Sequence, residues 1–582
     1  MPPTNQRRGF IIRTRRSLAF VFRSNTISPH SPLIAPLLLP LPFSQLTIKE
    51  PVIPASSPPP PASPRPLRFL IIGAGSRGTA YARAVATATQ GTIHAVAEPH
   101  PSKRRHLGRS YIWGEHGTPQ DGQEFPDWRA WLQWEQQRRE TKNDSQVGVD
   151  GVFICTLDST HVEILHAIAP LQLHILCEKP LALSLEDCLS VYHALTPNLS
   201  TNIFSIGHVL RYSPHNILLR KLLLLDRVIG DIVSLEHTEP VGFWHFSHSY
   251  VRGNWRRETP NGDGSLLTKS CHDIDFIMWL LSSPPPSSDP TSQQPIHPRT
   301  ITSTGSLTQF RKSQKPPAAG AATNCLSCPA ERDCIYSAVR IYNDMHVAKG
   351  DIDWPVNIVC EDIEDILPKT TSPRINKSDP IPTEHIPLAQ SHLLTRLRED
   401  YQTSNNATDE KESIHSRPWY GRCVYESDNN VCDDQTVTIT FSSDPPKTAL
   451  FHMIAPTEKQ CERRGRVYGT LGEISYDSRT ITIYSFQTRE TTTITVPKRP
   501  AEEEKAHGGG DYGLARSFVD AVDAVVNKGW GVAEAQRRFV GCDLEEAVRS
   551  HAVVFAAEEA RREEVVVKWG EWWGEKVNGM SK

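Results

Sequence analysis

The chain contains 582 residues, enough for two or three domains, and its formal net charge is −3. This near-neutral balance excludes the broad basic surface by which proteins bind nucleic acid. No apolar run reaches the ~20 residues needed to span a bilayer, so we expect neither nucleic acid nor a membrane as partner.

The first 66 residues lack the pattern of a folded segment. Residues 1–49 contain arginines and serines but no acidic residue, and residues 51–66 are largely Pro, Ser and Ala. Such a composition buries little apolar surface, so we expect a disordered tail on a cytoplasmic protein. The alternative is a mitochondrial presequence, which is typically rich in arginine and poor in acidic residues.

A glycine-rich turn follows the first apolar run, residues 67–72. Its G-x-G-x-x-G pattern is typical of a dinucleotide-binding loop, in which the glycines permit a sharp turn and close approach of a pyrophosphate. Free N–H groups at the start of the following helix then bind the phosphate charge. The alternative is a glycine turn in another kind of α/β unit. The predicted cofactor-binding residues here are Gly73, Gly75, Ser76, Arg77 and Gly78.

A second strand, residues 92–97, ends at Glu98, twenty residues beyond Gly78. An acidic residue at this place accepts hydrogen bonds from the adenosine ribose and repels the 2′-phosphate of NADP. Three basic residues at 103–105 offset part of that repulsion. We therefore expect NAD as the preferred cofactor, with incomplete discrimination against NADP.

Strands and helices alternate over residues 67–183, which predicts a Rossmann domain with a parallel sheet. Two further strands, at 151–155 and 173–177, are each followed by polar residues. Ligands bind beyond the carboxyl ends of such strands, so these side chains should gather near a nicotinamide. For Asp158 and His161 a turn and a helix cap are the alternative. The residues concerned are Thr156, Asp158, His161, Glu178 and Lys179.

The pattern changes in the second half, residues 184–570, where we expect an α+β domain with an open, largely antiparallel sheet. Helices are predicted at 512–526 and 532–563. The polar segments 282–298 and 369–417 are expected to be insertions that bury little apolar area. The predicted strands cover residues 232–240, 435–441, 449–454, 466–468, 481–486 and 491–496.

Three motifs together carry a resemblance to a known family. They are the glycine-rich turn, the segment Cys177-Glu178-Lys179-Pro180 and the segment Cys271-His272-Asp273-Ile274-Asp275. With these motifs the chain resembles the Gfo/Idh/MocA oxidoreductases, and more closely their StrI-like, aminocyclitol and inositol dehydrogenase-like branch. The resemblance implies a homo-oligomer that transfers hydride between NAD(P) and a carbinol of a sugar, sugar derivative or cyclitol.

The resemblance also implies the catalytic pair, Lys179 and His272. A lysine polarises the substrate oxygen and a histidine exchanges its proton with solvent. The family motif D-x-x-x-H has an aspartate four residues before the histidine, where this chain has Thr268. Lys269 or Asp273 is expected to take over from that aspartate. The alternatives are a surface lysine before a proline turn and a packed histidine at a helix start.

A polar and aromatic set lies between the two catalytic candidates and suits a polyhydroxylated ring. Ordinary loop and sheet-surface roles are the alternative for each member. Two other functions stay open: a glycosidase that recycles its NAD, and a non-catalytic nucleotide-binding sensor, against which the catalytic pair argues. The predicted substrate residues are Arg211, Tyr212, Tyr250, Arg252, Trp255 and Asp273, with His245 and His248 in the same segment.

The twelve cysteines are scattered and no secretory signal is recognised, which favours free or metal-bound thiols over disulfides. Cys325, Cys328 and Cys334 are spaced to grip one tetrahedral metal ion, with Cys423 or Cys360 as fourth ligand. We predict a structural zinc, because a fully thiolate-ligated ion leaves no position open for substrate. The alternative is three free cysteines in a mobile insertion.

Overall fold

A computed structural model describes residues 64–141, 146–259, 264–285, 294–368, 379–398, 418–505 and 507–578. The expectations for residues 1–63, and for parts of both predicted insertions, fall outside the described residues. Among the residues that are described, no helix combines the length and apolarity that a bilayer crossing requires.

The first sheet has six parallel strands in the order β3-β2-β1-β4-β5-β6. It confirms the predicted Rossmann architecture, and its order reverses between β1 and β4, where such sheets bind ligands. β6 extends the sheet beyond residue 183. The strands are β1 Leu67–Ile72, β2 Gly91–Ala97, β3 Glu124–Phe125, β4 Gly151–Ile154, β5 His174–Cys177 and β6 Phe204–Ile206.

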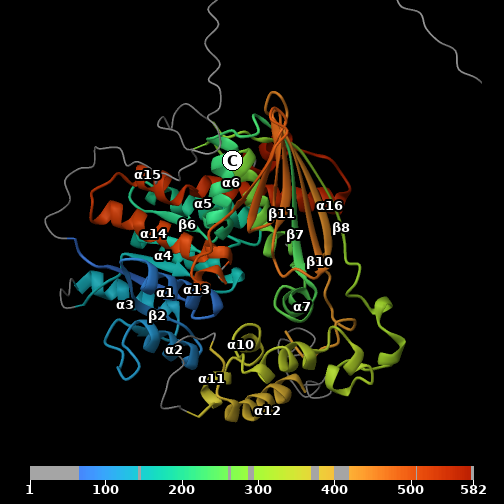
Figure 1. Cartoon of the computed structure of the whole chain (residues 1–582). Helices are drawn as coiled ribbons and strands as arrows, with labels where there is room; N and C mark the ends of the chain where they lie inside the picture. The colour runs from blue at the N-terminus through green and yellow to red at the C-terminus, as the bar shows by residue number, and fades with distance from the viewer. Residues whose placement is uncertain are drawn as a thin grey trace, which may run out of the picture. The chain divides into compact units, whose positions relative to one another are not determined.

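Helices cover this sheet on both faces (Figure 1), as the fully buried strands β4 and β5 require. The crossover helices are α1 Ser76–Ala88, α2 Pro101–Tyr111, α3 Trp128–Thr141, α4 His161–Ile168 and α5 Leu185–Leu195. A further helix, α14 (Gly510–Val526), returns from the far end of the chain to pack against α1. Its Phe518 ring lies 5.3 Å from that of Phe153, so both halves share one core.

The second sheet has nine strands in the order β14-β13-β12-β11-β7-β10-β9-β8-β15, and only the pair β7–β10 is parallel. This confirms the largely antiparallel sheet. The strands β8, β12 and β15 were not predicted. The strands are β7 Ile232–Gly242, β8 Pro298–Ser306, β9 Asp434–Phe441, β10 Thr448–Thr457, β11 Arg464–Gly469, β12 Gly472–Tyr476, β13 Thr480–Ser485, β14 Thr491–Thr495 and β15 Val567–Lys568.

Two helices pack beside this sheet, α9 (Cys271–Leu281) against β7 and α16 (Leu544–Glu563) against β8. The single helical region predicted for residues 532–563 is interrupted at Gly541, whose φ of 65° favours glycine. The chain restarts as α16 with Asp543 as N-cap. The other helices are α6 Pro214–Leu224, α7 Phe243–Phe246, α8 Ser265–Thr268, α13 Ala501–Glu504, α15 Val532–Ala535 and α17 Trp569–Trp573.

A separate lobe, formed by described residues between 307 and 425, has its own small core. Its helices are α10 (Val356–Val359), α11 (Ile363–Ile366) and α12 (Ile386–Leu397), which lie near α2 in Figure 1. The expectation that residues 369–417 bury little apolar area is wrong for α12. Its residues Ala389, Leu393 and Leu397 are buried, because their spacing of four places them on one helix face.

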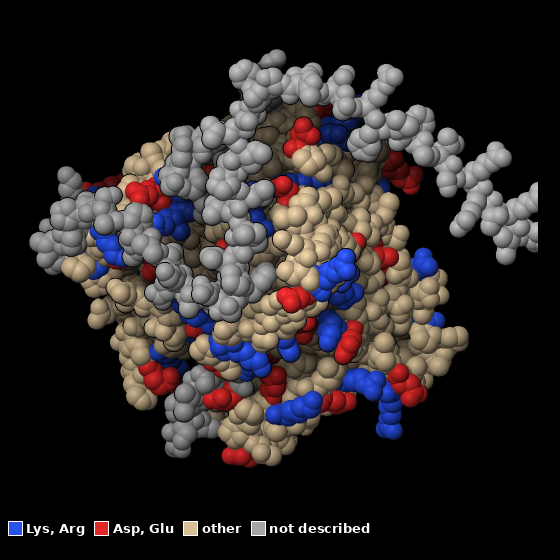
Figure 2. Space-filling model, turned by 45° about the horizontal axis from the view of Figure 1, so that its top comes forward, with Lys and Arg blue, Asp and Glu red and all other residues tan. Residues whose placement is uncertain are grey.

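The face of the molecule in Figure 2 carries lysine and arginine side chains mixed with aspartate and glutamate. No broad basic field covers the part of that face that the structure describes. The surface view therefore agrees with the near-neutral composition.

His551 ties α16 to the residue that follows the Lys179–Pro180 segment. Its Nε2 accepts the Leu181 N–H at 3.0 Å, and its Nδ1 donates to the Ala547 carbonyl at 2.7 Å. Burial lowers the pKa of His551 to about 3, and neighbouring His208 adds to the effect. Burial likewise lowers the pKa of His174 to about 4. Both imidazoles are therefore neutral in the folded protein and protonate on unfolding in mild acid.

This difference predicts that the free energy of unfolding falls as the pH drops below the ordinary imidazole pKa of about 6.5. Each depressed imidazole contributes about 1.4 kcal/mol per pH unit between that value and its folded pKa. His551→Gln retains an acceptor and a donor but does not titrate, so its urea-derived stability should fall less steeply between pH 7.5 and 5.5. Parallel curves for variant and wild type would contradict the assignment.

Candidate active site between the two sheets

A cavity of about 2470 Å³ begins at the glycine-rich loop and follows the carboxyl ends of the Rossmann strands. It continues between α9 and the lobe. Of the predicted cofactor residues, Gly78 and His161 do not line it, whereas the following do: Gly73, Gly75, Ser76, Arg77, Glu98, Thr156, Asp158 and Glu178. The predicted binding residues that follow the four strands β1, β2, β4 and β5 are thus brought to one cavity.

The three glycines of the loop differ in backbone conformation and in the space around the position of a Cβ atom. Gly73 has a φ of +93°, and a Cβ there would lie 2.7 Å from the Cys155 carbonyl oxygen. A Cβ on Gly78 would lie 1.9 Å from the Gly73 carbonyl oxygen, so this residue lets α1 pack closely on the turn. Gly75, in contrast, has no atom within 4 Å of its Cβ position. Gly75 therefore faces the open space that a pyrophosphate would enter.

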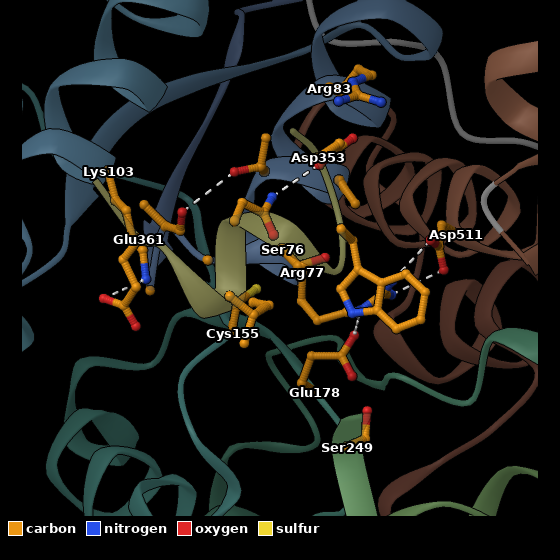
Figure 3. A pocket seen from close by; sticks show the side chains of 18 of the residues that line it. Ser76, Arg77, Arg83, Lys103, Cys155, Glu178, Ser249, Asp353, Glu361 and Asp511 are labelled. Atoms are coloured by element: carbon orange, nitrogen blue, oxygen red, sulfur yellow. Dashed lines mark hydrogen bonds and ion pairs between the residues drawn. The ribbon is translucent and has the colours of Figure 1, made fainter. Parts of the chain in front are cut away.

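Glu98 links the end of β2 to this loop. Its carboxylate accepts the Ala74 N–H at 2.7 Å and the His100 N–H at 2.8 Å. Of the basic residues that follow, Arg104 pairs with Glu124 at 2.8 Å and Lys103 pairs with Glu361 of the lobe at 3.1 Å (Figure 3). Two of the three basic side chains near Glu98 thus already have acidic partners.

Arg77 connects the loop to two distant segments. Its guanidinium lies 2.8 Å from Glu178, after β5, and 2.8 Å from Asp511, at the start of α14 (Figure 3). Burial alone would raise the pKa of both carboxyls, but Arg77 holds each below its usual value. Tyr81 donates a further hydrogen bond of 2.5 Å to Glu178. Sequence reasoning assigned no role to Asp511.

The two catalytic candidates meet at the inner end of the cavity. Lys179 Nζ donates to the Thr268 carbonyl oxygen at 2.7 Å. Thr268 lies three residues before α9, and His272 is the second residue of that helix. His272 is buried, and its Nδ1 has no hydrogen-bond partner among the residues that the structure describes. Burial lowers its pKa well below the ordinary value, and Lys179 and Arg463 lower it further. The ring is therefore neutral near pH 7.

Neither expected substitute for the missing aspartate reaches His272. Asp273 is fully buried and binds His237 at 2.7 Å and Arg463 at 2.9 Å, so it is a structural residue and not a substrate ligand. Lys269 pairs with Glu239 at 3.3 Å. Among the described residues no ion pair joins His272 to a carboxylate. At the position of the missing aspartate the chain instead offers the backbone carbonyl of Thr268.

The substrate end of the cavity is only partly as predicted. Tyr250 and Trp255 line it with their rings 6.0 Å apart, and the Trp255 indole donates to Asp158 at 2.9 Å. This bond ties the segment after β7 to the Rossmann domain. Sequence reasoning missed other residues that line the same end, which lie far apart along the chain: Asp353, Trp354 and Cys461.

Besides Gly78 and Asp273, four of the predicted cofactor and substrate residues do not line the cavity. Arg211 is buried and pairs with Asp275 through two hydrogen bonds of 2.7 Å, because burial of its charge requires a carboxylate. Tyr212 donates to the Val540 carbonyl at 2.8 Å. His161 binds the Pro180 carbonyl at 2.8 Å and so supports the turn after Lys179. Arg252 points instead toward Cys325.

The four candidate zinc ligands are described residues, but no three of their sulfur atoms lie within 4.8 Å of one another. In the described part of the chain, only His208, Asp275 and Cys542 form so close a group. Asp275 in that group is already paired with Arg211. The arrangement of the thiols thus does not by itself support the predicted zinc.

Comparison with known proteins gives matches to the first sheet and to the first strands of the second. Residues 67–204 match a family model described as an oxidoreductase family with an NAD-binding Rossmann fold. Residues 221–310 match the model of the same family's C-terminal alpha/beta domain. The two matches follow one another in the order in which the chain builds the two sheets.

Individual relatives cover less of the chain. A 2,7-anhydro-N-acetylneuraminate hydratase of Escherichia coli is 30% identical over 24% of this chain and 35% of that protein. An inositol 2-dehydrogenase of Rhizobium meliloti is 25% identical over 38% of this chain and 57% of its own. The chain spans little more than a third of the length of the first curated relatives it matches.

Solved structures support the fold. A levoglucosan dehydrogenase in complex with NADH and levoglucosan superposes with a TM-score of 0.52 at 15% identity, covering 86% of this chain and 99% of that one. Residues 67–204 and 221–310 thus match, in order, the two domains of the Gfo/Idh/MocA family of oxidoreductases.

Proposed function

We propose that this protein is an NAD-dependent oxidoreductase that transfers hydride between nicotinamide and a carbinol carbon of a sugar, sugar derivative or cyclitol. The observation that carries the proposal is the single cavity that runs from the glycine-rich loop to Lys179 and His272. Relatives named inositol 2-dehydrogenase and levoglucosan dehydrogenase support the substrate class. The narrower StrI-like assignment stays a prediction.

The residues that line the cavity fit NAD at its loop end. Gly75 leaves room for the pyrophosphate, and Glu98 lies where the adenosine ribose of NAD would be bound. NAD is preferred over NADP, since Glu98 is acidic and both Lys103 and Arg104 are paired with acids. When bound, the nicotinamide supplies the hydride acceptor.

In the proposed mechanism the lysine stabilises charge on the substrate oxygen and the histidine takes the proton. Lys179, fixed by the Thr268 carbonyl, points its ammonium group at the substrate hydroxyl and stabilises the developing negative charge on oxygen. Neutral His272 accepts the hydroxyl proton, and the nearby cations favour its prompt release. A carboxylate beside the ring would stabilise its protonated form, so Thr268 in the place of the family's aspartate agrees with the lowered pKa of His272.

We also propose a cytoplasmic homo-oligomer. Its interface would use the open sheet, because hydrophobic side chains such as Val233 on β7 and Leu450 on β10 are exposed. Large apolar side chains on one sheet are typical of a contact surface.

A second candidate is a reaction in which NAD⁺ oxidises the substrate and the NADH so formed is reoxidised within the same turnover, when it returns the hydride to the reaction intermediate. The hydratase among the relatives favours it, because adding water requires no net oxidation. Net formation of reduced cofactor separates the two candidates: the dehydrogenase accumulates it with time, whereas the recycling enzyme does not.

The catalytic pair gives the first test. With a panel of sugars and cyclitols and NAD⁺, wild-type enzyme should form reduced cofactor, read by absorbance. Lys179→Met and His272→Gln should each lower kcat by on the order of a hundredfold or more while NAD⁺ affinity stays unchanged. Lys312→Met, at an exposed lysine outside the cavity, is the matched control. Wild-type rates in either cavity variant would exclude that residue from catalysis.

The glycine-rich loop gives the second test. Gly75→Ala places a methyl group in open space at a permitted φ of −71°, so the variant should fold with wild-type stability but bind NAD⁺ more weakly. Gly73→Ala should unfold at a lower temperature, because it combines a positive φ with a 2.7 Å clash. Calorimetric titration and thermal unfolding separate the effects, and full NAD⁺ affinity in Gly75→Ala would argue against a pyrophosphate at this loop.

A further inference from the structure

His272 takes up the substrate proton at a place with little access to solvent. Only 7% of the residue is exposed, and no carboxylate of the described residues pairs with it. Burial and the nearby cations Lys179 and Arg463 lower its pKa, so the ring does not keep a proton near pH 7. A proton that enters this ring must therefore pass to a second group before the next turnover.

A second histidine faces His272 inside the cavity. The ring centroids of His272 and His507 lie 6.3 Å apart, with an angle of 45° between the two planes, and both residues line the cavity. This separation is too long for a direct hydrogen bond between the rings. One hydroxyl group, of the substrate or of a water molecule, can span it with two hydrogen bonds. His507 is therefore in reach of a proton that leaves His272.

His208 is as near to His272 but does not lead to solvent. Its ring centroid also lies 6.3 Å from that of His272. It is only 1% exposed, and its other face stacks on His551, which is buried as well. A proton passed to His208 would stay in the interior, so His507 offers the way out.

His507 has the carboxylate partner that His272 lacks. Its Nδ1 lies 3.0 Å from Oδ1 of Asp511. Burial alone would raise the pKa of Asp511, but Arg77 holds it below the usual value, so the carboxylate is ionised and accepts the bond. Nδ1 therefore carries the proton in the neutral ring, and Nε2 carries the lone pair. Because 40% of the side chain is exposed, the ring also reaches solvent.

The backbone at His507 has a conformation that favours glycine. Its φ is +52°, and Gly508 and Gly509 follow with φ of +60° and +88°. Residues other than glycine rarely adopt this left-handed region, and such strain is typical of functional positions. A histidine held in this conformation beside the cavity thus points to a role for its ring. Glycine, in contrast, fits the conformation of residue 507 without strain.

We propose that His507, oriented by Asp511, relays the substrate proton from His272 to solvent. The proposal rests on the proposed function. When the carbinol is oxidised, its C–H electron pair leaves as hydride to NAD⁺, its O–H proton passes to His272, and a C=O bond forms. His272 then gives the proton through the bridging hydroxyl to Nε2 of His507. Asp511 stabilises the imidazolium, and a base in solvent takes the proton, so both rings return to the neutral form.

Stopped-flow measurements on the full chain with NAD⁺ and an active substrate of the panel test the relay. Absorbance of reduced cofactor follows hydride transfer, and a pH-indicator dye in dilute buffer follows proton release. In the wild type the two signals should rise together. His507→Gln can still donate to Asp511 but cannot carry a proton, so its proton release should be slower by on the order of tenfold or more, and kcat should fall while KM is unchanged.

His507→Gly separates the relay from folding. The variant should unfold at the same or a higher temperature than the wild type, because glycine suits the positive φ. Its proton release should be as slow as that of His507→Gln. Added imidazole, which can occupy the space of the deleted ring, should restore proton release in His507→Gly and leave the wild type unchanged.

His392→Gln is the matched control. Nε2 of His392 bonds to Asp362 at 2.9 Å, and His392 does not line the cavity. When His392 is replaced, Asp362 keeps Arg396 at 3.1 Å, just as Asp511 keeps Arg77 when His507 is replaced. Loss of a histidine–aspartate bond is thus common to both variants, and the control should show wild-type proton release.

Carbethoxylation of the cofactor-free protein, mapped by mass spectrometry, gives a readout that does not depend on activity. His507 should react before His272, as their exposure requires. If His272 reacts first, or if a folded His507→Gln releases protons in step with hydride transfer, the relay is overturned. Slow release in His507→Gly that imidazole does not restore would also overturn it. A wild-type protein that forms no reduced cofactor with any substrate would instead overturn the proposed function, and the relay with it.

Discussion

The ion bridge from Arg77 to Glu178 and Asp511 is the interaction on which the candidate site depends. It joins three segments that are distant in sequence: the glycine-rich loop, the end of β5 and the start of α14. Both carboxylates are almost completely buried, so each requires the guanidinium to remain charged. Because Lys179 directly follows Glu178, this bridge also fixes where the lysine stands relative to the cofactor loop.

A second set of contacts joins the Rossmann domain to the other half of the molecule and positions His272 relative to it. Lys179 binds the Thr268 carbonyl, and the helix that begins three residues later presents His272. Trp255 adds a parallel connection through Asp158. The site is therefore assembled at the junction of the two sheets. The lobe covers the outer side of the site, and ion pairs such as Lys103 with Glu361 join the lobe to the Rossmann domain.

The sequence predicts what depends on local pattern and misses what depends on distant partners. The glycine-rich turn, the parallel strands and the antiparallel strands follow from short-range spacing, and the structure confirms them. Arg211 was assigned to substrate because it is polar and near the right motifs, yet Asp275, 64 residues away, pairs with it in the interior. Asp511 lies 434 residues from Arg77, and the residues next to it in the sequence do not indicate that partner.

The central claim is that nicotinamide, Lys179 and His272 share one end of the cavity. A crystal structure of the full chain with NAD⁺ tests it most directly. The account predicts the pyrophosphate at Gly75, the adenosine ribose at Glu98 and the nicotinamide ring against Lys179 and His272. A cofactor bound with its nicotinamide away from both residues, or bound outside the cavity, would contradict the account.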